Sequence, residues 1–353
     1  MDDSVKDLSS RKKFLSELIG TRIARIERIG GGRNSRVYKL DCGSTKKYTA
    51  KFYFHNKIDE RDRLNTEYSS LTFLWSHGVR CIPEPAGCYP GRNCAIYEFV
   101  DGKKILSEEI TTPDIDFAVH FLALLRQLRL KDDAGDLPAA SEACFSPQDL
   151  VDNIKGRFRK LISLPADEVI YKELKSFLTC EFAVCFENIL SWCKNELERI
   201  DMPFDKNLSL AERTLSPSDF GFHNALRRND GKIVFIDFEY FGWDDPAKMI
   251  SDFILHPGMR LAEKFKKRFA KKMFAEFDGY ELLVDRVAIA YPLYGLKWCM
   301  VLLNEFIPEL MLRRTFASLK KSDKTELQAM QLAKARNMAR KIENEYENFP
   351  YSR

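Results

Sequence analysis

The stretch Leu215-Ser-Pro-Ser-Asp219-Phe-Gly-Phe-His-Asn224, followed by Ile233-Val-Phe-Ile-Asp237-Phe-Glu239-Tyr240, decides the fold. It places an aspartate, then an asparagine in the spacing Asp-x4-Asn, and then a second aspartate at the end of an apolar run. Ala225–Arg228 and Lys232–Ile236 can pair as strands, because Asn229-Asp230-Gly231 supplies a tight turn between them. We expect this hairpin to bring Asp237 close to Asn224.

These residue types in this order suit phosphoryl transfer from a nucleoside triphosphate. That chemistry uses one aspartate to accept the proton of the attacking hydroxyl, and an asparagine with a later aspartate to hold Mg²⁺ ions. Asp219 is therefore the candidate base, and Asn224 and Asp237 are the candidate metal ligands. Aspartate and asparagine are also common loop residues, because their side chains bond the nearby backbone. An ordinary loop is the alternative that this stretch alone leaves open.

The composition indicates a globular protein without the marks of export or of a nucleic-acid partner. The chain has 353 residues, 45% of them hydrophobic, enough for one large or two moderate domains. Its 56 basic and 52 acidic residues leave a net charge of only +4. The opening residues are polar, and no apolar run approaches the roughly 18 residues of a membrane span. The nine cysteines form no Cys-x-x-Cys pair, which favours reduced thiols in a cytoplasmic protein over disulfides or a zinc site.

A glycine-rich turn between two strands is predicted near the N-terminus. Ile23–Ile29 alternates apolar and polar residues, Gly30-Gly31-Gly32-Arg33-Asn34-Ser35 follows, and Arg36–Leu40 is the second strand. Glycines let backbone N–H groups approach phosphates closely, although an ordinary hairpin has the same pattern. The turn matches neither the G-x-G-x-x-G pattern nor a Walker P-loop.

Lys51 is an unusual lysine, because apolar residues flank it on the predicted strand Lys47–Phe54. A buried ammonium needs a negative partner. The helix predicted over Asp59–Gly78 offers Glu67, which lies on or beside that helix's apolar stripe. A strand lysine paired with a helix glutamate positions ATP phosphates in kinases. The alternative is two unrelated surface charges.

The rest of the chain reads mainly as helices. A last apolar strand, Asn93–Val100, ends at the turn Asp101-Gly102, and helical periodicity begins near Ile115. Further helices are expected over about 148–163, 167–199, 286–312 and 322–348. The basic segment 260–273 repeats apolar residues every four positions, which predicts an amphipathic helix with a solvated basic face. Contact with a membrane surface or an acidic partner is the alternative for this segment.

With these signals in this order, the chain resembles the aminoglycoside phosphotransferase and choline kinase superfamily, the small-molecule relatives of protein kinases. The resemblance covers roughly residues 20–310. It implies an α+β, bilobal, protein-kinase-like fold. The expected N-terminal lobe, residues 1–101, is a small antiparallel sheet with one helix, and the expected C-terminal lobe, residues 102–353, is larger and mainly helical.

The resemblance implies ATP and Mg²⁺ as cofactors and assigns roles to residues. Asp219 would be the catalytic base, and Asn224 and Asp237 would hold Mg²⁺. Lys51 would bind the α- and β-phosphates, with Glu67 behind it. The remaining nucleotide contacts would come from Gly31, Gly32, Asn34 and Ser35 in the glycine-rich turn and from the backbone of Glu98 and Val100 at the adenine.

The chain departs from the family pattern at one position. Many members carry a histidine two residues before the catalytic aspartate, where this chain has Pro217. The change puts the loop geometry in doubt more than the activity. No activation loop with an Ala-Pro-Glu arrangement follows Asp237, which disfavours a protein-kinase role.

Three residues are candidates for choosing the substrate. The run Ile236-Asp-Phe-Glu239-Tyr240 is similar to that of choline and ethanolamine kinases, where the tyrosine helps to enclose an ammonium group. Trp298 is similar to a late-helix tryptophan that lines the same pocket, although a core role is the alternative. An amino alcohol, a sugar and an aminoglycoside all remain open as the acceptor.

The sequence therefore predicts an ATP- and Mg²⁺-dependent kinase that phosphorylates a hydroxyl of a small metabolite. No nucleic-acid partner and no integral membrane contact are expected, and a homodimer is compatible with the sequence. The rival interpretation is a pseudokinase, a nucleotide-binding or scaffold module on the same fold. The five polar residues at positions 51, 67, 219, 224 and 237 favour the enzyme.

Overall fold

The structure is a computed structural model that describes residues 5–30, 34–43, 46–54, 61–280, 282–311 and 323–351. Its described residues fall into two compact units. We call N-terminal unit the described residues of Met1–Lys104 and Asn224–Tyr240. The helical unit comprises those of Ile105–His223, Phe241–Met311 and Ser322–Arg353. The segment Asn224–Tyr240 therefore clusters with the N-terminal unit, although the expected lobes assigned it to the C-terminal part.

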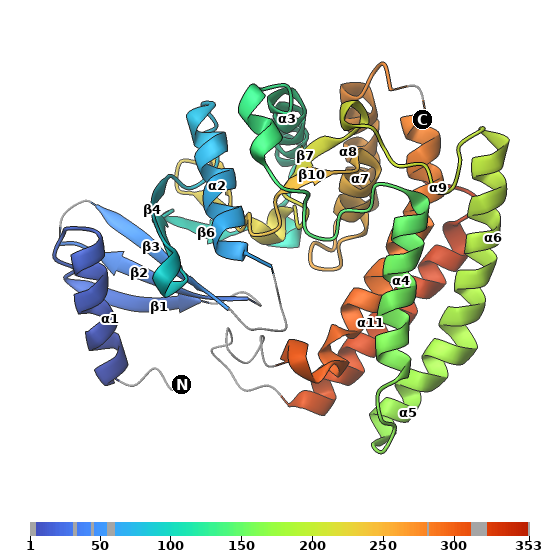
Figure 1. Ribbon diagram of the computed structural model, residues 1–353, viewed down its shortest axis with the longest axis horizontal. Coiled ribbons are helices and arrows are strands. Elements are labelled where there is room, and N and C mark those ends of the chain that lie inside the picture. Colours follow the sequence, from blue (N-terminus) through green and yellow to red (C-terminus); the bar gives the residue numbers. More distant parts are fainter. Residues whose placement is uncertain are drawn as a thin grey trace. The chain divides into compact units, whose positions relative to one another are not determined.

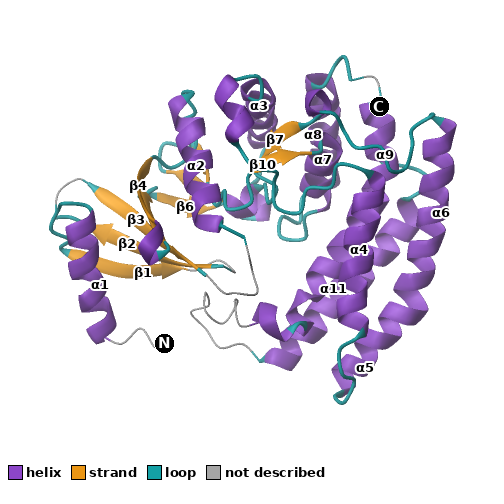
Figure 2. Cartoon of the chain, in the orientation of Figure 1, coloured by secondary structure: helices purple, strands orange, loops and turns teal. Residues whose placement is uncertain are grey.

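The N-terminal unit is built on an antiparallel sheet of five strands in the order β1-β2-β3-β5-β4. Figure 2 labels β1, β2, β3 and β4 of this sheet. The strands are β1 (Arg25–Gly30), β2 (Ser35–Asp41), β3 (Lys47–Tyr53), β4 (Pro85–Tyr89) and β5 (Cys94–Glu98). Pro85 begins an edge strand, where a missing N–H costs no ladder bond. Two helices, α1 (Val5–Leu18) and α2 (Arg63–Ser76), belong to this unit. Leu15 of α1 lies in the same core as Tyr38 and Ile96 of the sheet.

A second, three-stranded sheet in the N-terminal unit contains the predicted hairpin. It joins β6 (Gly102–Lys104), β8 (Ala225–Arg228) and β9 (Ile233–Phe235) in the order β6-β8-β9. Ala225 pairs with Phe235 across the hairpin, and the turn residue Gly231 has φ +85°, which favours glycine. The hairpin prediction is confirmed, and its register carries Asn224 toward the end of the strand that precedes Asp237.

The helical unit is organised around α9 (Leu283–Leu302), which packs against four other helices (Figure 1). These are α4 (Pro147–Ile162), α6 (Ala183–Arg199), α7 (Pro246–Leu255) and α11 (Lys324–Glu345). The unit also contains α3 (Thr112–Leu128), α5 (Val169–Ser176), α8 (Glu263–Glu276) and the paired strands β7 (Thr214–Ser216) and β10 (Gly242–Asp244). The helix expected over 167–199 is divided into α5 and α6 by a π-helical segment, Phe177–Phe182.

The apolar helix in the middle of this unit corrects one expectation. Leu283–Phe306 is long and apolar enough to cross a membrane by length and composition, although no such segment was expected. In this structure 72% of its most apolar window is buried inside the protein. A buried core helix passes the same test, so one such helix is weak evidence for a membrane span.

The basic segment forms the amphipathic helix that its period predicts. Leu261, Phe265, Phe269 and Met273 are all buried in the helical unit. Lys264, Lys267 and Lys271 are exposed, while Arg268 and Lys272 pair with Asp116 of α3 at 2.6 and 3.0 Å. The apolar face is therefore part of the core, as expected.

Candidate functional site

Asp219 lies in the helical unit, in a loop that begins where β7 ends at Ser216. Ser218 has φ +66°, a left-handed conformation that is uncommon for a residue other than glycine. Three hydrogen bonds fix this serine: its N–H donates to Ser216 Oγ (3.0 Å), its Oγ donates to the Ser141 carbonyl (3.1 Å) and its Oγ accepts from Lys248 Nζ (2.8 Å). Backbone strain held by surrounding contacts is frequent at functional sites.

Two histidines bond the same carboxylate oxygen of Asp219. His223 Nε2 lies 3.1 Å from Asp219 Oδ1, and His256 Nε2 lies 3.0 Å from it. The two imidazole rings stack with their centroids 3.8 Å apart and their planes 9° apart. Burial alone would raise the pKa of Asp219, but the hydrogen bonds from the two histidines hold that pKa well below its usual value. Asp219 is therefore an anion at every pH near neutrality.

Trp298 belongs to the same surroundings within the helical unit. Its ring meets the His256 ring edge-on, with centroids 4.7 Å apart, and its Nε1 donates to Asp252 Oδ1 at 2.8 Å. Asp252 in turn lies 3.2 Å from Lys248 Nζ, which also bonds Asp244 Oδ2 at 2.7 Å. Trp298 is half-buried, so part of its surface is accessible. Its role toward a substrate stays a prediction.

Lys51 is the centre of the charged cluster in the N-terminal unit. Its Nζ lies 2.6 Å from Glu67 Oε2, 2.5 Å from Asp237 Oδ1 and 3.7 Å from Glu239 Oε2. The predicted ion pair with Glu67 is present, and both of its side chains are buried. Burial would lower the pKa of Lys51, but the carboxylates of Asp237, Glu67 and Glu239 hold it well above its usual value. Lys51 is therefore a permanent cation among three carboxylates.

The hairpin brings the two predicted metal ligands together, as expected. The N–H of Ile236 donates to the carbonyl of Asn224 at 2.9 Å, so Asn224 lies across the hairpin from the residue before Asp237. Asp237 has φ +71°, and the next N–H, that of Phe238, donates to Glu67 Oε1 at 3.3 Å. The metal role of Asn224 stays a prediction.

Glu239 is almost completely buried beside this cluster. Its Oε1 accepts from Asn34 Nδ2 and lies 3.9 Å from Arg63 Nε. Asn34 Nδ2 also donates to Tyr240 Oη at 2.5 Å. Burial, together with the nearby Asp237 and Glu67 carboxylates, raises the pKa of Glu239 to about 7. The predicted substrate residues Glu239 and Tyr240 thus bond an asparagine of the glycine-rich turn.

Of the other predicted nucleotide contacts, the structure describes Ser35, Glu98 and Val100. Gly31 and Gly32 lie outside the described residues. Ser35 is the buried first residue of β2. Glu98 ends β5 and its side chain pairs with Arg228 at 2.6 Å, while Val100, two residues later, is buried. Their roles toward a nucleotide stay predictions.

Among the residues that the structure describes, two groups of side chains have ligand atoms close enough to hold a metal ion. Glu67, Asp237 and Glu239 offer carboxylate oxygens within 4.8 Å of one another, as do Asp219, His223 and His256 with mixed oxygen and nitrogen atoms. Mg²⁺ prefers oxygen ligands, and all three members of the first group are carboxylates. The carboxylates of the N-terminal unit therefore fit Mg²⁺ by donor type and by charge.

Sequence reasoning missed three members of these clusters. His223 stands inside the stretch that decided the fold, four residues after Asp219, so its spacing was a usable signal. His256 is 37 residues from Asp219, and no local pattern links them. Arg63 begins α2 and is 2% exposed; a single arginine near a helix start gives no sign of such burial.

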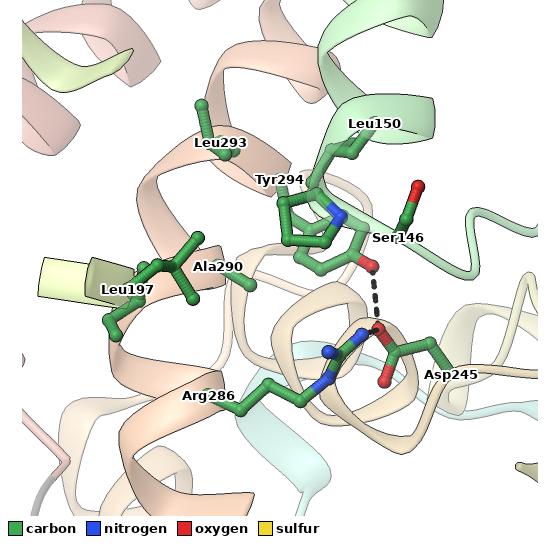
Figure 3. A pocket seen from close by; sticks show the side chains of 10 residues that line it. Ser146, Leu150, Leu197, Asp245, Arg286, Ala290, Leu293 and Tyr294 are labelled. Atoms are coloured by element: carbon green, nitrogen blue, oxygen red, sulfur yellow. Dashed lines mark hydrogen bonds and ion pairs between the residues drawn. The ribbon is translucent and has the colours of Figure 1, made fainter. Parts of the chain in front are cut away.

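The helical unit also encloses a cavity of about 20 Å³ between α4, α6, α7 and α9 (Figure 3). Leu150, Leu197, Ala290 and Leu293 supply apolar walls. At one end Arg286 donates to Asp245 Oδ2 at 2.6 Å, and Tyr294 Oη lies 3.5 Å from the same oxygen. A cavity of this size holds one water molecule and excludes a metabolite.

Comparison with known proteins identifies the fold. No protein-family model matches the sequence, and no curated protein matches it. Among solved structures, the AMP-bound spectinomycin phosphotransferase APH(9)-Ia has a TM-score of 0.61 at 14% identity, covering 91% of this chain and 98% of the other. The choline kinase LicA from Streptococcus pneumoniae has a TM-score of 0.60 at 16% identity, covering 94% and 98%. The ADP-bound aminoglycoside phosphotransferase APH(2'')-Ib has a TM-score of 0.59 at 14% identity, covering 97% and 99%.

These likenesses confirm the predicted fold. The chain has the mixed α+β architecture of the small-molecule kinases, with an antiparallel five-stranded sheet in its N-terminal part and a mostly helical C-terminal part. The three proteins named above are all phosphotransferases, and two of them were solved with an adenine nucleotide bound. Because the identities are 14 to 16%, the likeness establishes the fold and leaves the reaction to be argued from the residues.

Proposed function

We propose that the protein is an ATP- and Mg²⁺-dependent kinase that transfers the γ-phosphate of ATP to a hydroxyl group of a small metabolite. One observation carries the proposal: a buried Lys51 lies between Glu67 and Asp237, with Asn224 across the same hairpin. A buried lysine with carboxylates on two sides suits binding of a polyphosphate and its metal. Asp219, five positions before Asn224 in the sequence, supplies the base.

Each residue has a defined task in this proposal. Lys51 binds the α- and β-phosphates, and Glu67 holds the ammonium in place. Asn224 and Asp237 hold Mg²⁺, which when bound neutralises the triphosphate charge that develops during transfer. Asp219 accepts a hydrogen bond from the acceptor hydroxyl, orients its oxygen toward the γ-phosphorus and receives its proton as the new O–P bond forms. ADP leaves as the bond between the γ-phosphorus and the bridging oxygen breaks.

The acceptor class is proposed from the comparisons. The similar proteins include phosphotransferases for spectinomycin, for aminoglycosides and for choline, so the first acceptors to test are aminocyclitols, aminoglycosides, choline and ethanolamine. Glu239, Tyr240 and Trp298 remain the candidate residues for choosing among them. Tyr240 Oη is already bonded to Asn34, and Trp298 Nε1 to Asp252, so both would offer ring surface rather than a free polar atom toward an ammonium group.

The test is phosphate transfer from radiolabelled ATP to this panel, with and without Mg²⁺. We expect at least one acceptor to be labelled by wild type, and Asp219→Asn to lose at least about 100-fold in kcat, the typical share of general-base catalysis. Asp152→Asn, an exposed aspartate of α4 in the same unit, is the matched control and should behave as wild type. Binding of MgATP without transfer to any acceptor would favour the pseudokinase instead. Asp219→Asn activity equal to that of wild type would remove Asp219 as the base.

A further inference from the structure

Asp219 does not hold its position alone, because two histidines bond it from different parts of the helical unit. His223 follows it by four residues, whereas His256 comes from the end of α7. Pro217 cannot offer a side-chain hydrogen bond, whereas both imidazoles bond the Asp219 carboxylate. Of the two, His256 is the one whose protonation state the surrounding hydrogen bonds define.

The hydrogen bonds of His256 specify one tautomer. The backbone N–H of Gly258 donates to His256 Nδ1 at 3.1 Å, so Nδ1 carries a lone pair and no proton. The ring proton must then be on Nε2, which lies 3.0 Å from Asp219 Oδ1 and donates to it. We assign His256 as the neutral Nε2–H tautomer. Burial lowers its pKa, although the hydrogen bond to Asp219 opposes that effect, so the neutral form persists at neutral pH.

The His256 ring is held rigidly. It lies against the stacked His223 ring, and the Trp298 ring meets it at 81°. The turn that follows is also fixed, because the Met259 N–H donates to the His256 carbonyl at 3.2 Å and Ser107 Oγ donates to the Met259 carbonyl at 2.6 Å. A Cβ at Gly258 would lie 3.0 Å from His256 Cε1, so glycine allows this close approach. The charged and titratable side chains that act on the ring include Asp219, His223 and Asp252.

We propose that His256 is a positioning residue for the base, which rests on the proposed function. The torsion that turns a carboxylate about its terminal bond is broad, so hydrogen bonds decide where each oxygen points. A neutral donor at Oδ1 fixes that direction and leaves the full negative charge of Asp219 for the acceptor hydroxyl. A cationic donor would neutralise much of this charge. The neutral tautomer and the rigid packing of His256 therefore orient the Asp219 carboxylate.

The first test separates a positioning role from a structural one. We expect His256→Ala to lower kcat for transfer from MgATP to the best acceptor of the panel by up to about 100-fold, the cost of a small misplacement of a reacting group. The KM for that acceptor should change less than about threefold, because the acceptor itself does not touch His256 in this proposal. His256→Gln should recover most of the loss, since its amide N–H can donate near the position of Nε2. His120→Ala, at an exposed site on α3, should match wild type.

Two results would overturn the inference. One is a His256→Ala enzyme with wild-type kcat. The other is a His256→Gln enzyme no better than His256→Ala when both melt within a few degrees of wild type, which would mean that donation to Asp219 is not what matters.

A second readout does not depend on activity. In ¹⁵N NMR of histidine side chains at pH 7.5, we expect His256 as the neutral Nε2–H tautomer, with resonances that shift in Asp219→Asn and not in Asp152→Asn. A charged His256, or one protonated on Nδ1, would overturn the inference even in an active enzyme. Conversely, absence of transfer by wild type on the whole panel would overturn the proposed function, while the NMR result would still decide whether His256 donates to Asp219.

Discussion

Lys51 Nζ lies 2.5 Å from Asp237 Oδ1, so a buried lysine and a half-buried aspartate 186 positions apart in the chain form one ion pair. The contact joins the third strand of the sheet to the end of the hairpin. Glu67 on α2 completes it at 2.6 Å, and Tyr53 Oη donates to the same Glu67 oxygen at 2.7 Å. The cluster is therefore a structural junction of the N-terminal unit as well as its candidate phosphate site.

Removing the ammonium should destabilise the N-terminal unit. Lys51→Met keeps the side-chain length but leaves the buried Glu67 and Glu239 and the half-buried Asp237 without their cation. Breaking a buried pair in this way costs about 3–5 kcal/mol. Urea unfolding should show this loss, while Lys103→Met, at an exposed site on β6, should stay within about 0.5 kcal/mol of wild type. Equal stabilities of the two variants would show that Lys51 does not compensate these carboxylates.

Magnesium binding should depend on Asp237. Wild type at MgATP about 100 times above the dissociation constant should gain about 2.7 kcal/mol, seen as a rise in the melting temperature. Asp237→Asn removes one carboxylate of the cluster, and we expect it to lose most of the Mg²⁺-dependent part of that rise. Asp152→Asn is the control with the same chemical change at an exposed position. If Asp237→Asn and wild type gained the same shift from Mg²⁺, Asp237 would not be a ligand.

The pH dependence of stability should report the hydrogen bonds to Asp219. Because its folded pKa is lowered, its ionised form contributes stability above the unfolded pKa of aspartate, about 3.9, and that contribution is lost as pH falls through the folded pKa. The difference in unfolding free energy between wild type and Asp219→Asn should thus be constant from about pH 8 to pH 5. It should shrink below about pH 4. Guanidinium unfolding across this range measures it, and a difference that grew on acidification would have the wrong sign.

Replacing glycine by alanine should have opposite effects on stability at two positions of the helical unit, Gly242 and Gly156. A Cβ at Gly242, on β10, would lie 2.3 Å from the Pro138 carbonyl oxygen and 2.6 Å from the Ala140 nitrogen, both backbone atoms. Gly242→Ala should therefore displace β10 and cost several kcal/mol, at the upper end of single substitutions. Gly156, inside α4, has open space at its Cβ position. Gly156→Ala should raise stability by about 0.5–1 kcal/mol, and calorimetry of both variants checks the contrast.

Local patterns predicted most of the elements and part of the site. The hairpin around Gly231 was predictable because strand periodicity and turn chemistry are properties of neighbouring residues. The pairing of Lys51 with Glu67 was predictable because a charged residue among apolar neighbours needs a partner, and the following helix offered one. The first inference used two neighbouring strands and their turn, and the second used a strand and the helix after it.

The parts that could not be predicted depend on distant contacts. His256 reaches Asp219 across 37 positions, and Arg63 reaches Glu239 across a larger gap; packing of α7 and α2 decides both. The sequence also did not predict that Asn224–Tyr240 belongs to the N-terminal unit, because the amino-acid composition does not change at the ends of this segment. One helix was expected over 167–199, but a π-helical segment divides it into α5 and α6. Hydrophobic periodicity does not reveal a segment as short as this one.

Phosphorus NMR of the reaction tests the central claim most directly. Wild type and Asp219→Asn are each incubated with MgATP and the best acceptor of the panel. We expect wild type to produce ADP and an equal amount of a new phosphomonoester, and Asp219→Asn to produce both at least about 100 times more slowly. Formation of the phosphomonoester at equal rates by the two enzymes, or of ADP and free phosphate alone by wild type, would contradict the account.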